Sequence, residues 1–470
     1  DFTCKKLIMF QIGDRERQYV IDTRVIDISP LKEVLQSNKI VKVLHNAKFD
    51  YKFIKKWAGI SLEEIFDTFL AERVINCGKQ DYGYSLSRCT ERYLGVTLDK
   101  ETRNKFVGLT GQPFTVDQIH YGANDVVHLL DIREKQLVKI HSLELHDVTR
   151  LENAVVKVFS EIEYEGLMID KDKWTAMAED NVKLAFEQEL KLDDMVLEHP
   201  LLQHYRVPVQ VDMFAPMDKV RKTHIKWSSP MQTLELFQNL VPNLEDVNGK
   251  KLNKHRYKHK LIDEYIRYKE RTKLANAYGT KFFNYVNSDG KVHTNFSQIL
   301  DTGRVSSSKP NMQQIPSDNT FRNCFVTEPG WVFVSSDYSS QELNVIAYGS
   351  QDPVWLDALE KGMDLNGVCA DLVFEDKWRD ADADGKKKLR TQIKAINFGL
   401  AYGMGPFKLA DTLQISKEEA EALIEKYFTE LPNIRDFLTK LGTFGTRNGY
   451  IRTFKPFKRR RWFDTWFPKI

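Results

Sequence analysis

Residues 390–403 read RTQIKAINFGLAYG, and this stretch carries the most specific pattern of the chain. Apolar side chains recur around it at helical spacing and predict an amphipathic helix: Leu389, Ile393, Ile396 and Leu400. Two cations and then two aromatic rings recur every four residues on another face: Arg390, Lys394, Phe398 and Tyr402. One interpretation is a surface helix with incidental charges. The other is a helix along which a nucleoside triphosphate lies, with phosphates on the cations and the sugar and base against the rings.

Two further blocks precede this helix in the chain. Residues 337–349 read DYSSQELNVIAYG and follow the apolar run 331–334 (WVFV), which we expect to form a strand. Asp337 would then lie where the strand ends, and Glu342 just inside the next helix. Residues 301–316 read DTGRVSSSKPNMQQIP.

The three blocks, in this order, resemble motifs of family A DNA polymerases, the DNA polymerase I type. RTQIKAINFGLAYG resembles R-x3-K-x3-F-x3-YG, DYSSQEL resembles DYSQIEL, and residues 301–316 resemble TGRLSSxxPNLQNIP. The resemblance implies template-directed addition of dNTPs to a primer 3′ end by two-metal phosphoryl transfer. The compact spacing suggests a bacteriophage source, while a bacterial or organellar source stays open.

The resemblance also implies roles for single residues. Asp337 matches the aspartate that binds both catalytic Mg²⁺ ions, for which Mn²⁺ is an alternative. Glu342 matches the residue that occupies the place of a 2′-hydroxyl and so favours dNTPs. Lys394 matches the lysine that contacts the triphosphate and protonates the leaving group, and Arg390 a further phosphate contact. Phe398 and Tyr402 match the positions beside the sugar and base, and a Phe at 398 disfavours dideoxynucleotides.

Further contacts to DNA follow from the same resemblance. Three residues match those that touch the primer–template near its terminus: Arg304, Asn311 and Gln313. The basic stretch 254–284 is expected to follow duplex phosphates, with a helix of mixed charges as the alternative. The family segment GYxxTxxGRRR resembles residues 448–463, so Arg459–Arg461 are expected to face nucleic acid. One departure is Asn366, which stands where the family often has a histidine that contacts phosphate.

The N-terminal part contains two motifs of another kind. Residues 45–50 read HNAKFD and residues 121–125 read YGAND. They resemble the second and third motifs of the DEDD exonuclease superfamily, in its Tyr-containing branch. The resemblance implies a 3′–5′ proofreading exonuclease with Asp50 and Asp125 as metal ligands and Tyr121 orienting a water molecule, with two metal ions per active site.

Each predicted active site is incomplete in this sequence. The first exonuclease motif, DxE, has only Asp14-Arg15-Glu16 as a candidate, in a predicted hairpin turn, so we expect the true motif upstream of Asp1. A second palm carboxylate, in an HDE hairpin, is expected beyond Ile470, because His146-Asp147 precedes Asp337. We therefore expect residues 1–470 alone to catalyse poorly or not at all.

The predicted architecture is an α/β, RNase H-like exonuclease domain followed by an α+β right-hand polymerase with thumb, palm and fingers. The expected boundaries are 1–135 for the exonuclease domain, 136–290 for connecting helices and thumb, 291–349 for the first part of the palm, 350–445 for the fingers and 446–470 for the return to the palm.

Composition narrows the class of protein without deciding it. The 470 residues carry a net charge of only +3, so a nucleic-acid role must rest on local clusters. No apolar run approaches a membrane span, and the scattered cysteines favour an intracellular, cytoplasmic protein, in a host cytoplasm if viral. The expected partners are primer–template DNA and dNTP, with a processivity factor left open. A single-subunit RNA polymerase, disfavoured by Glu342, and a non-catalytic DNA-binding fragment are the alternatives.

Overall fold

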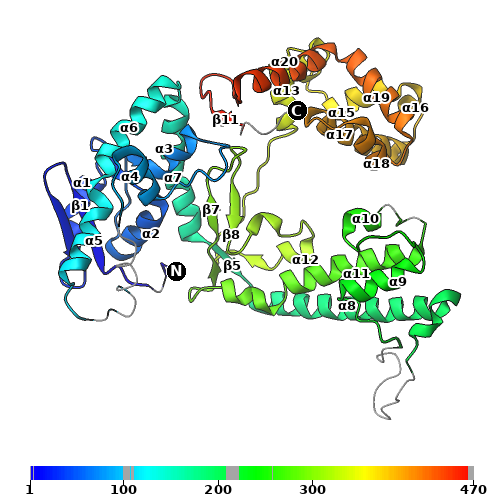
Figure 1. Cartoon of the computed structure of the whole chain (residues 1–470), viewed down its shortest axis with the longest axis horizontal. Helices are drawn as coiled ribbons and strands as arrows, with labels where there is room; N and C mark the ends of the chain where they lie inside the picture. The colour runs from blue at the N-terminus through cyan, green and yellow to red at the C-terminus, as the bar shows by residue number, and fades with distance from the viewer. Residues whose placement is uncertain are drawn as a thin grey trace.

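The computed structural model places three lobes around a group of central strands (Figure 1). It describes residues 2–3, 5–98, 106, 109, 111–207, 222–253, 255–256 and 258–463. The first lobe holds the N-terminal α/β elements, the second is built on the long helices α8 and α11, and the third contains α13 to α20. No helix in these ranges is both long and apolar enough to cross a membrane.

The N-terminal lobe contains two strand pairs. The predicted hairpin is confirmed: β1 (Met9–Gly13) and β2 (Gln18–Asp22) pair antiparallel around a turn at Asp14. The second pair is parallel and joins β3 (Lys42–Leu44) to β4 (Ile65–Asp67). Within the described residues the two pairs are not hydrogen-bonded to each other.

Helices connect and cover these strands. Helix α2 (Ala47–Ala58) links β3 to β4, as a parallel pair requires. The other helical elements of the lobe are η1 (Ser29–Leu31), α1 (Lys32–Leu35), α3 (Thr68–Ile75), α4 (Leu86–Leu94), α5 (Val116–Val127) and α6 (Leu129–Ser142). Helix α7 (His146–Glu165) then leads out of the lobe, and His146-Asp147 form its first turn.

The central strands come from distant parts of the chain. Strand β5 (Leu167–Ile169) pairs antiparallel with both β6 (Lys291–Val292) and β9 (Phe325–Val326). Strand β5 thus lies in the range predicted for connecting helices and thumb, yet pairs with strands from the range predicted for the palm. A separate ribbon, called here the β7–β8 ribbon, joins β7 (Asn295–Ser297) to β8 (Ser306–Ser308) and carries Arg304 in its connecting loop.

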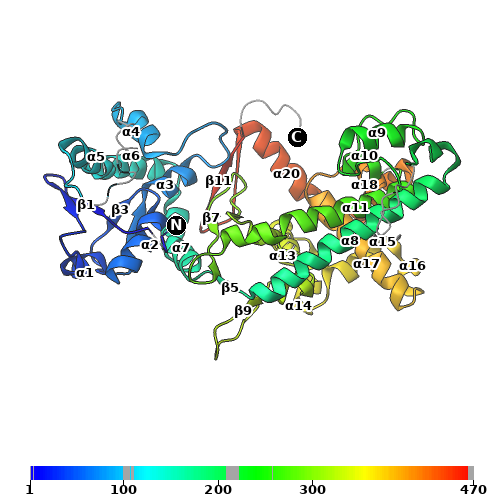
Figure 2. The same ribbon diagram turned by 90° about the horizontal axis from the view of Figure 1, so that it is seen from below.

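The second lobe is a two-helix arm with a small helical cap. Helix α8 (Lys171–Glu198) and α11 (Lys260–Ala277) run side by side in both views (Figures 1 and 2). Tyr265 and Tyr268 of α11 are buried in the core of this lobe, so these two tyrosines are packing residues. The remaining elements of the lobe are η3 (Pro200–Tyr205), α9 (Pro230–Gln238), α10 (Gly249–Asn253) and η5 (Thr280–Tyr285).

The third lobe is helical, and it contains the helix predicted around residues 390–403. At its centre α17 (Ala383–Ala401) buries Ile393 and Ile396 completely. Around it lie α13 (Gln341–Ser350), α14 (Pro353–Glu360), α15 (Leu365–Phe374), α16 (Asp376–Arg379), α18 (Pro406–Leu413), α19 (Lys417–Glu430) and α20 (Pro432–Asn448). The short elements η6 (Met312–Gln314) and α12 (Asn319–Arg322) precede it, and β10 (Tyr450–Arg452) pairs with β11 (Arg460–Trp462) after it.

The strand predicted at residues 331–334 is wrong. These residues form no regular element, and the relative exposure of their side chains runs from 57% for Phe333 to 90% for Val334. A strand needs a neighbour for its backbone hydrogen bonds, and none of the described strands pairs with this run. Asp337 therefore lies in an exposed loop that leads into α13, and not at a strand end.

Candidate nucleotide-binding and nuclease sites

The row of side chains predicted on residues 390–403 lies on α17. Arg390 and Lys394 are exposed on the helix, Phe398 is partly buried, and Tyr402 is the 68% exposed residue that caps the helix end. The Lys394 ammonium lies 5.9 Å from the centroid of the Phe398 ring. The two halves of the row therefore meet on one helix face, cations first and rings second.

Arg390 is held by a partner that the sequence analysis missed. Its Nε and Nη2 atoms donate to the two carboxylate oxygens of Asp364 at 2.9 and 3.1 Å. Asp364 is the N-cap of α15 and also accepts from the Gly367 N–H at 3.1 Å. Burial would raise the pKa of Asp364, but the Arg390 guanidinium and the Gly367 N–H hold it below its usual range. Since a guanidinium has five N–H donors, its Nη1 edge stays available for a phosphate.

Asn366 contributes to the lobe interior. Its side chain is only 4% exposed and accepts a hydrogen bond of 3.1 Å from the Asn397 amide. The pair connects α15 to α17, so Asn366 supports the helix packing beneath the row.

All three sequence blocks meet at Glu342. Its Oε1 atom accepts from the Arg304 guanidinium at 2.7 Å and from the Tyr402 hydroxyl at 3.1 Å, and Arg304 also donates to Tyr402 at 3.1 Å. Burial, followed by the hydrogen bond and negative charge of Glu342, raises the pKa of Tyr402. The contact links the β7–β8 ribbon, the first turn of α13 and the end of α17.

The other predicted DNA contacts shape the segment after β8. Asn311 caps η6 by accepting from the Gln313 N–H at 3.1 Å, and Gln313 accepts from the Ser307 N–H at 3.0 Å. Both residues are exposed. Asp337 is exposed as well and accepts from the Tyr338 N–H at 2.9 Å. The prediction that it holds metal stays a prediction.

The three candidate nuclease residues lie on two helices of the N-terminal lobe. Asp50 is in the first turn of α2, while Tyr121 and Asp125 lie on α5. Burial, then the negative charges of Asp67 and Asp125, raises the pKa of Asp50 to about 7. Three carboxylates from α2, α5 and the end of β4 are therefore close enough to influence one another.

Asp67, which the sequence analysis missed, holds the backbone in front of Asp50. Its carboxylate accepts the N–H groups of Asn46 at 2.9 Å and Ala47 at 2.8 Å. It also caps α3 through Phe69 at 2.9 Å and Leu70 at 3.4 Å. An aspartate directly after an apolar strand and before a helix was the available signal.

The Asp14-Arg15-Glu16 candidate is confirmed to be a turn. Asp14 accepts the N–H groups of Glu16 and Arg17, each at 2.8 Å, and Arg15 pairs with Glu134 across to α6. Among the described residues no group of three or more His, Cys, Asp or Glu side chains is arranged to hold a metal ion. Mg²⁺ usually takes only one or two protein carboxylates and completes its shell with water and phosphate oxygens, which Asp50 and Asp125 could match.

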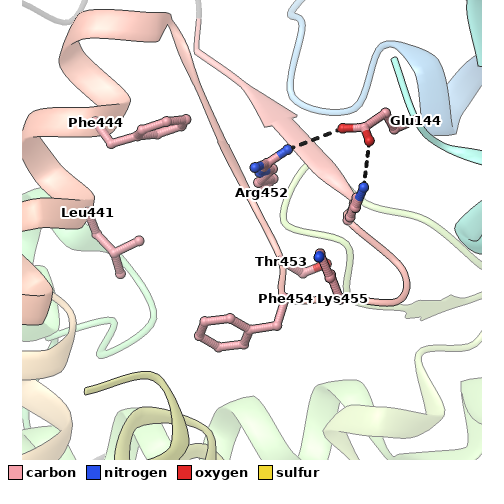
Figure 3. Close-up of a pocket in the computed structure, with 8 residues that line it drawn as sticks. Glu144, Leu441, Phe444, Arg452, Thr453, Phe454 and Lys455 are labelled. Atoms are coloured by element: carbon pink, nitrogen blue, oxygen red, sulfur yellow. Dashed lines mark hydrogen bonds and ion pairs between the residues drawn. The ribbon is translucent and has the colours of Figure 1, made fainter. Parts of the chain in front are cut away.

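The β10–β11 hairpin packs against the N-terminal half of the chain. Lys458 and Arg452 bind Glu144 at 2.6 and 3.4 Å, beside a pocket lined by Phe444 and Phe454 (Figure 3). Arg459 pairs with Glu152, and both side chains are nearly buried. The expectation that Arg459 faces nucleic acid is therefore wrong, because α7 supplies a carboxylate that the sequence order did not reveal.

The arrangement defines a class of protein before any comparison. A helical lobe with an Arg-Lys-Phe-Tyr row, a two-helix arm and strands between them form a right-hand polymerase, here preceded by an α/β nuclease-type lobe (Figure 1). Residues 219–467 match the model of "DNA polymerase family A" and residues 3–140 that of "3'-5' exonuclease", so the chain belongs to DNA polymerase family A. Helix α7 lies between the two matched ranges.

Several bacterial proteins named DNA polymerase I are similar to this chain. That of Aquifex aeolicus is 29% identical over 93% of this chain and 74% of its own length. Those of Rhizobium leguminosarum and Chloroflexus aurantiacus are each 28% identical over 90% and 89% of this chain. The chain spans 41% and 44% of these two proteins. These relatives give no support to a bacteriophage source or to an RNA polymerase.

A solved structure has the same fold. The polymerase domain of Pol1 from M. smegmatis, in complex with DNA primer-template and dNTP, superposes with a TM-score of 0.75 over 95% of this chain and 73% of that one. At 23% identity, this likeness concerns the fold.

Proposed function

We propose that the protein, at its full natural length, is a DNA-directed DNA polymerase that adds dNTPs to a primer 3′ end, with an N-terminal lobe that excises mismatched 3′ ends. The observation that carries the proposal is the contact of Glu342 with Arg304 and Tyr402 at the end of the α17 row. It joins a primer-contacting residue, a sugar-selecting residue and a base-contacting residue at one point.

The residues of the α17 row bind different parts of the nucleotide. Arg390 and Lys394 bind phosphate oxygens through charge-assisted hydrogen bonds, and Phe398 and Tyr402 lie beside the sugar and base. Glu342 takes the space that a 2′-hydroxyl would need. Arg304, Asn311 and Gln313 contact the primer–template, and Arg304 reads minor-groove acceptors that all base pairs share.

We assign metal binding to carboxylates at two places, the loop before α13 and the N-terminal lobe. Asp337 would hold Mg²⁺ in the polymerase site, and Asp50 with Asp125 would hold it in the nuclease site, with Mn²⁺ as an alternative. The bound ion supplies Lewis-acid stabilisation of the charge that develops on phosphate oxygens. Lys394 gives a proton to the leaving pyrophosphate, and Tyr121 orients the attacking water.

The same proposal includes the partners and the division of the chain. Primer–template DNA and dNTP are the ligands, and the exposed cations of α11 follow duplex phosphates. A processivity factor and a cytoplasmic location remain expectations. The boundaries of exonuclease domain, thumb, palm and fingers are kept as predicted from the sequence.

A primer-extension assay tests the polymerase proposal. The protein at its full natural length should extend a primer with dNTPs and Mg²⁺, and Asp337→Ala should abolish extension while leaving primer–template binding within about twofold. Asp376→Ala, an exposed acidic residue of the same half of the chain, is the matched control and should extend normally. Binding without extension by the wild-type protein would instead support the non-catalytic alternative.

A further inference from the structure

One buried carboxylate joins helix α2, which carries Asp50, to the β7–β8 ribbon. Glu163 of α7 is 1% exposed, and its side chain binds three groups from two other elements. One oxygen pairs with the Lys48 ammonium and accepts the Phe296 N–H at 2.7 Å, and the other accepts from Lys52 at 2.5 Å. Lys48 also donates to the Phe296 carbonyl. We call these four residues the Glu163 clamp.

The clamp holds α2 from the side away from its candidate metal ligand. Lys48 and Lys52 are four residues apart and so share a face of α2, whereas Asp50, between them, points elsewhere. The clamp can therefore fix the position of the helix without touching the group that Asp50 would bind.

On its other side the clamp holds the ribbon that carries Arg304. Phe296 belongs to β7 and pairs with Ser307 of β8, and Arg304 lies in the loop between these strands. The same ribbon inserts Ile299, which is 1% exposed, into the hydrophobic core of the N-terminal lobe. Its attachment to the nuclease lobe is thus both polar and apolar.

A second glutamate on the same face of α7 repeats the arrangement. Glu152 and Glu163 are eleven residues apart, three helical turns, and so point to the same side. Glu152 accepts from the Gln298 amide at 2.5 Å and pairs with Arg459 of the β10–β11 hairpin. Helix α7 therefore bonds to Phe296 of β7 and to Gln298, which directly follows β7, and through Arg459 it also bonds to the β10–β11 hairpin.

Buried charges are expensive unless they are paired, and breaking one pair leaves the partner without compensation. Two cations and one carboxylate therefore give this junction one well-defined geometry. We propose that Glu163 is a positioning residue that sets the relation between the Asp50 helix and the Arg304 ribbon, so that a frayed primer end released near Arg304 reaches the nuclease site. This inference rests on the proposed polymerase activity and on the proposed nuclease activity of the N-terminal lobe.

The test compares two substrates of the nuclease in the protein at its full natural length. A single-stranded DNA reaches Asp50 directly, whereas a mismatched primer end on a duplex must come from the polymerase side. Glu163→Gln should lower excision of the mismatched end, relative to that of the single strand, by about fivefold or more. Loss of both activities by the same factor would overturn the inference, because it would indicate only a damaged nuclease site.

Lys55→Gln is the matched control. Lys55 is on the same helix and pairs with Glu161 and Glu165 of α7, but these contacts do not reach β7. Its ratio of the two excision rates should stay at the wild-type value, and a fivefold fall there would contradict a specific role for Glu163.

If Glu163→Gln does not fold, Lys52→Gln, which removes the more exposed cation, should lower the ratio in the same direction, and an unchanged ratio would overturn the inference. Wild-type protein that degrades neither substrate would contradict the proposed nuclease function itself.

Discussion

The Arg304 guanidinium donates a 2.7 Å hydrogen bond to the Glu342 carboxylate, across 38 positions of sequence. The same carboxylate oxygen accepts from Tyr402, 60 positions further on. A single acidic group therefore fixes the relative positions of a ribbon loop and two helices, which gives the proposed sugar pocket a defined wall before any nucleotide arrives.

The first prediction concerns sugar selection at this wall. Glu342→Ala removes the side chain that would exclude a 2′-hydroxyl, so incorporation of NTPs relative to dNTPs should rise about tenfold or more, about 1.4 kcal/mol of discrimination. Single-nucleotide extension with paired NTP and dNTP substrates measures it. Tyr402→Phe, which removes only a hydroxyl partner of Glu342, should change the ratio much less. An unchanged sugar preference in Glu342→Ala would remove the proposed role.

The second prediction concerns Asp364, which orients Arg390 through two hydrogen bonds. Asp364→Asn keeps the size of the side chain but weakens that grip, so KM for dNTP should rise about three- to tenfold with little change in kcat. Asp357→Asn, which breaks an exposed ion pair with Lys361 in the same lobe, is the control. A lower KM in Asp364→Asn would mean that Asp364 competes with the phosphate and does not position its ligand.

The third prediction follows from the pKa of Asp50, which is raised to about 7 from a usual value near 3.8. Between these pH values the folded state binds more protons than the unfolded state, so stability falls as pH rises through this window. Asp50→Asn removes this loss. In the presence of a chelator, its free energy of unfolding should exceed that of wild type by roughly 1–3 kcal/mol at pH 8 and by little below pH 4.

Urea unfolding at several pH values measures this difference. Asp27→Asn is the control, because Ser29 lowers the pKa of Asp27 and its removal should give no gain in stability with rising pH. Parallel stability curves for wild type and Asp50→Asn would contradict the assignment. Added Mg²⁺ should stabilise wild type at pH 8 more than Asp50→Asn if Asp50 is a ligand.

The fourth prediction concerns the basic arm. Lys273 is exposed on α11, whereas Arg256 and Arg267 are paired with Asp263. Lys273→Gln should weaken binding of primer–template DNA of any sequence and reduce the slope of log K against log salt by about one. Fluorescence anisotropy over a salt series measures the slope. Lys361→Gln, on the surface of the third lobe, should leave it unchanged.

Local periodicity explains which elements were predictable. The N-terminal hairpin and α17 follow from turn residues and from apolar spacing within a few residues, and both formed as predicted. Strand β5 and the exposed run 331–334 were not predictable in this way, because a strand depends on a partner that lies far along the chain.

The same distinction applies to the site. Helical spacing predicted the α17 row, whereas Glu342 was associated with that row only through the resemblance to family A DNA polymerases, because it lies 60 positions from Tyr402. Asp364 and Glu163 gave no such signal, since their partners are 26 and 115 residues away. From sequence alone, an isolated acidic residue in a helical stretch is expected to be solvated. Its cationic partner becomes evident only in the folded structure.

Ile299 restricts how this protein can be truncated. Its side chain belongs to the core of the N-terminal lobe, although it lies in the loop between β7 and β8 that also carries Arg304. Deleting the nuclease lobe would leave that side chain and the Glu163 carboxylate without their surroundings, at a cost in solubility and fold. The N-terminal lobe therefore cannot be deleted without exposing these groups. Single substitutions are better suited than truncation for removing its proposed nuclease activity.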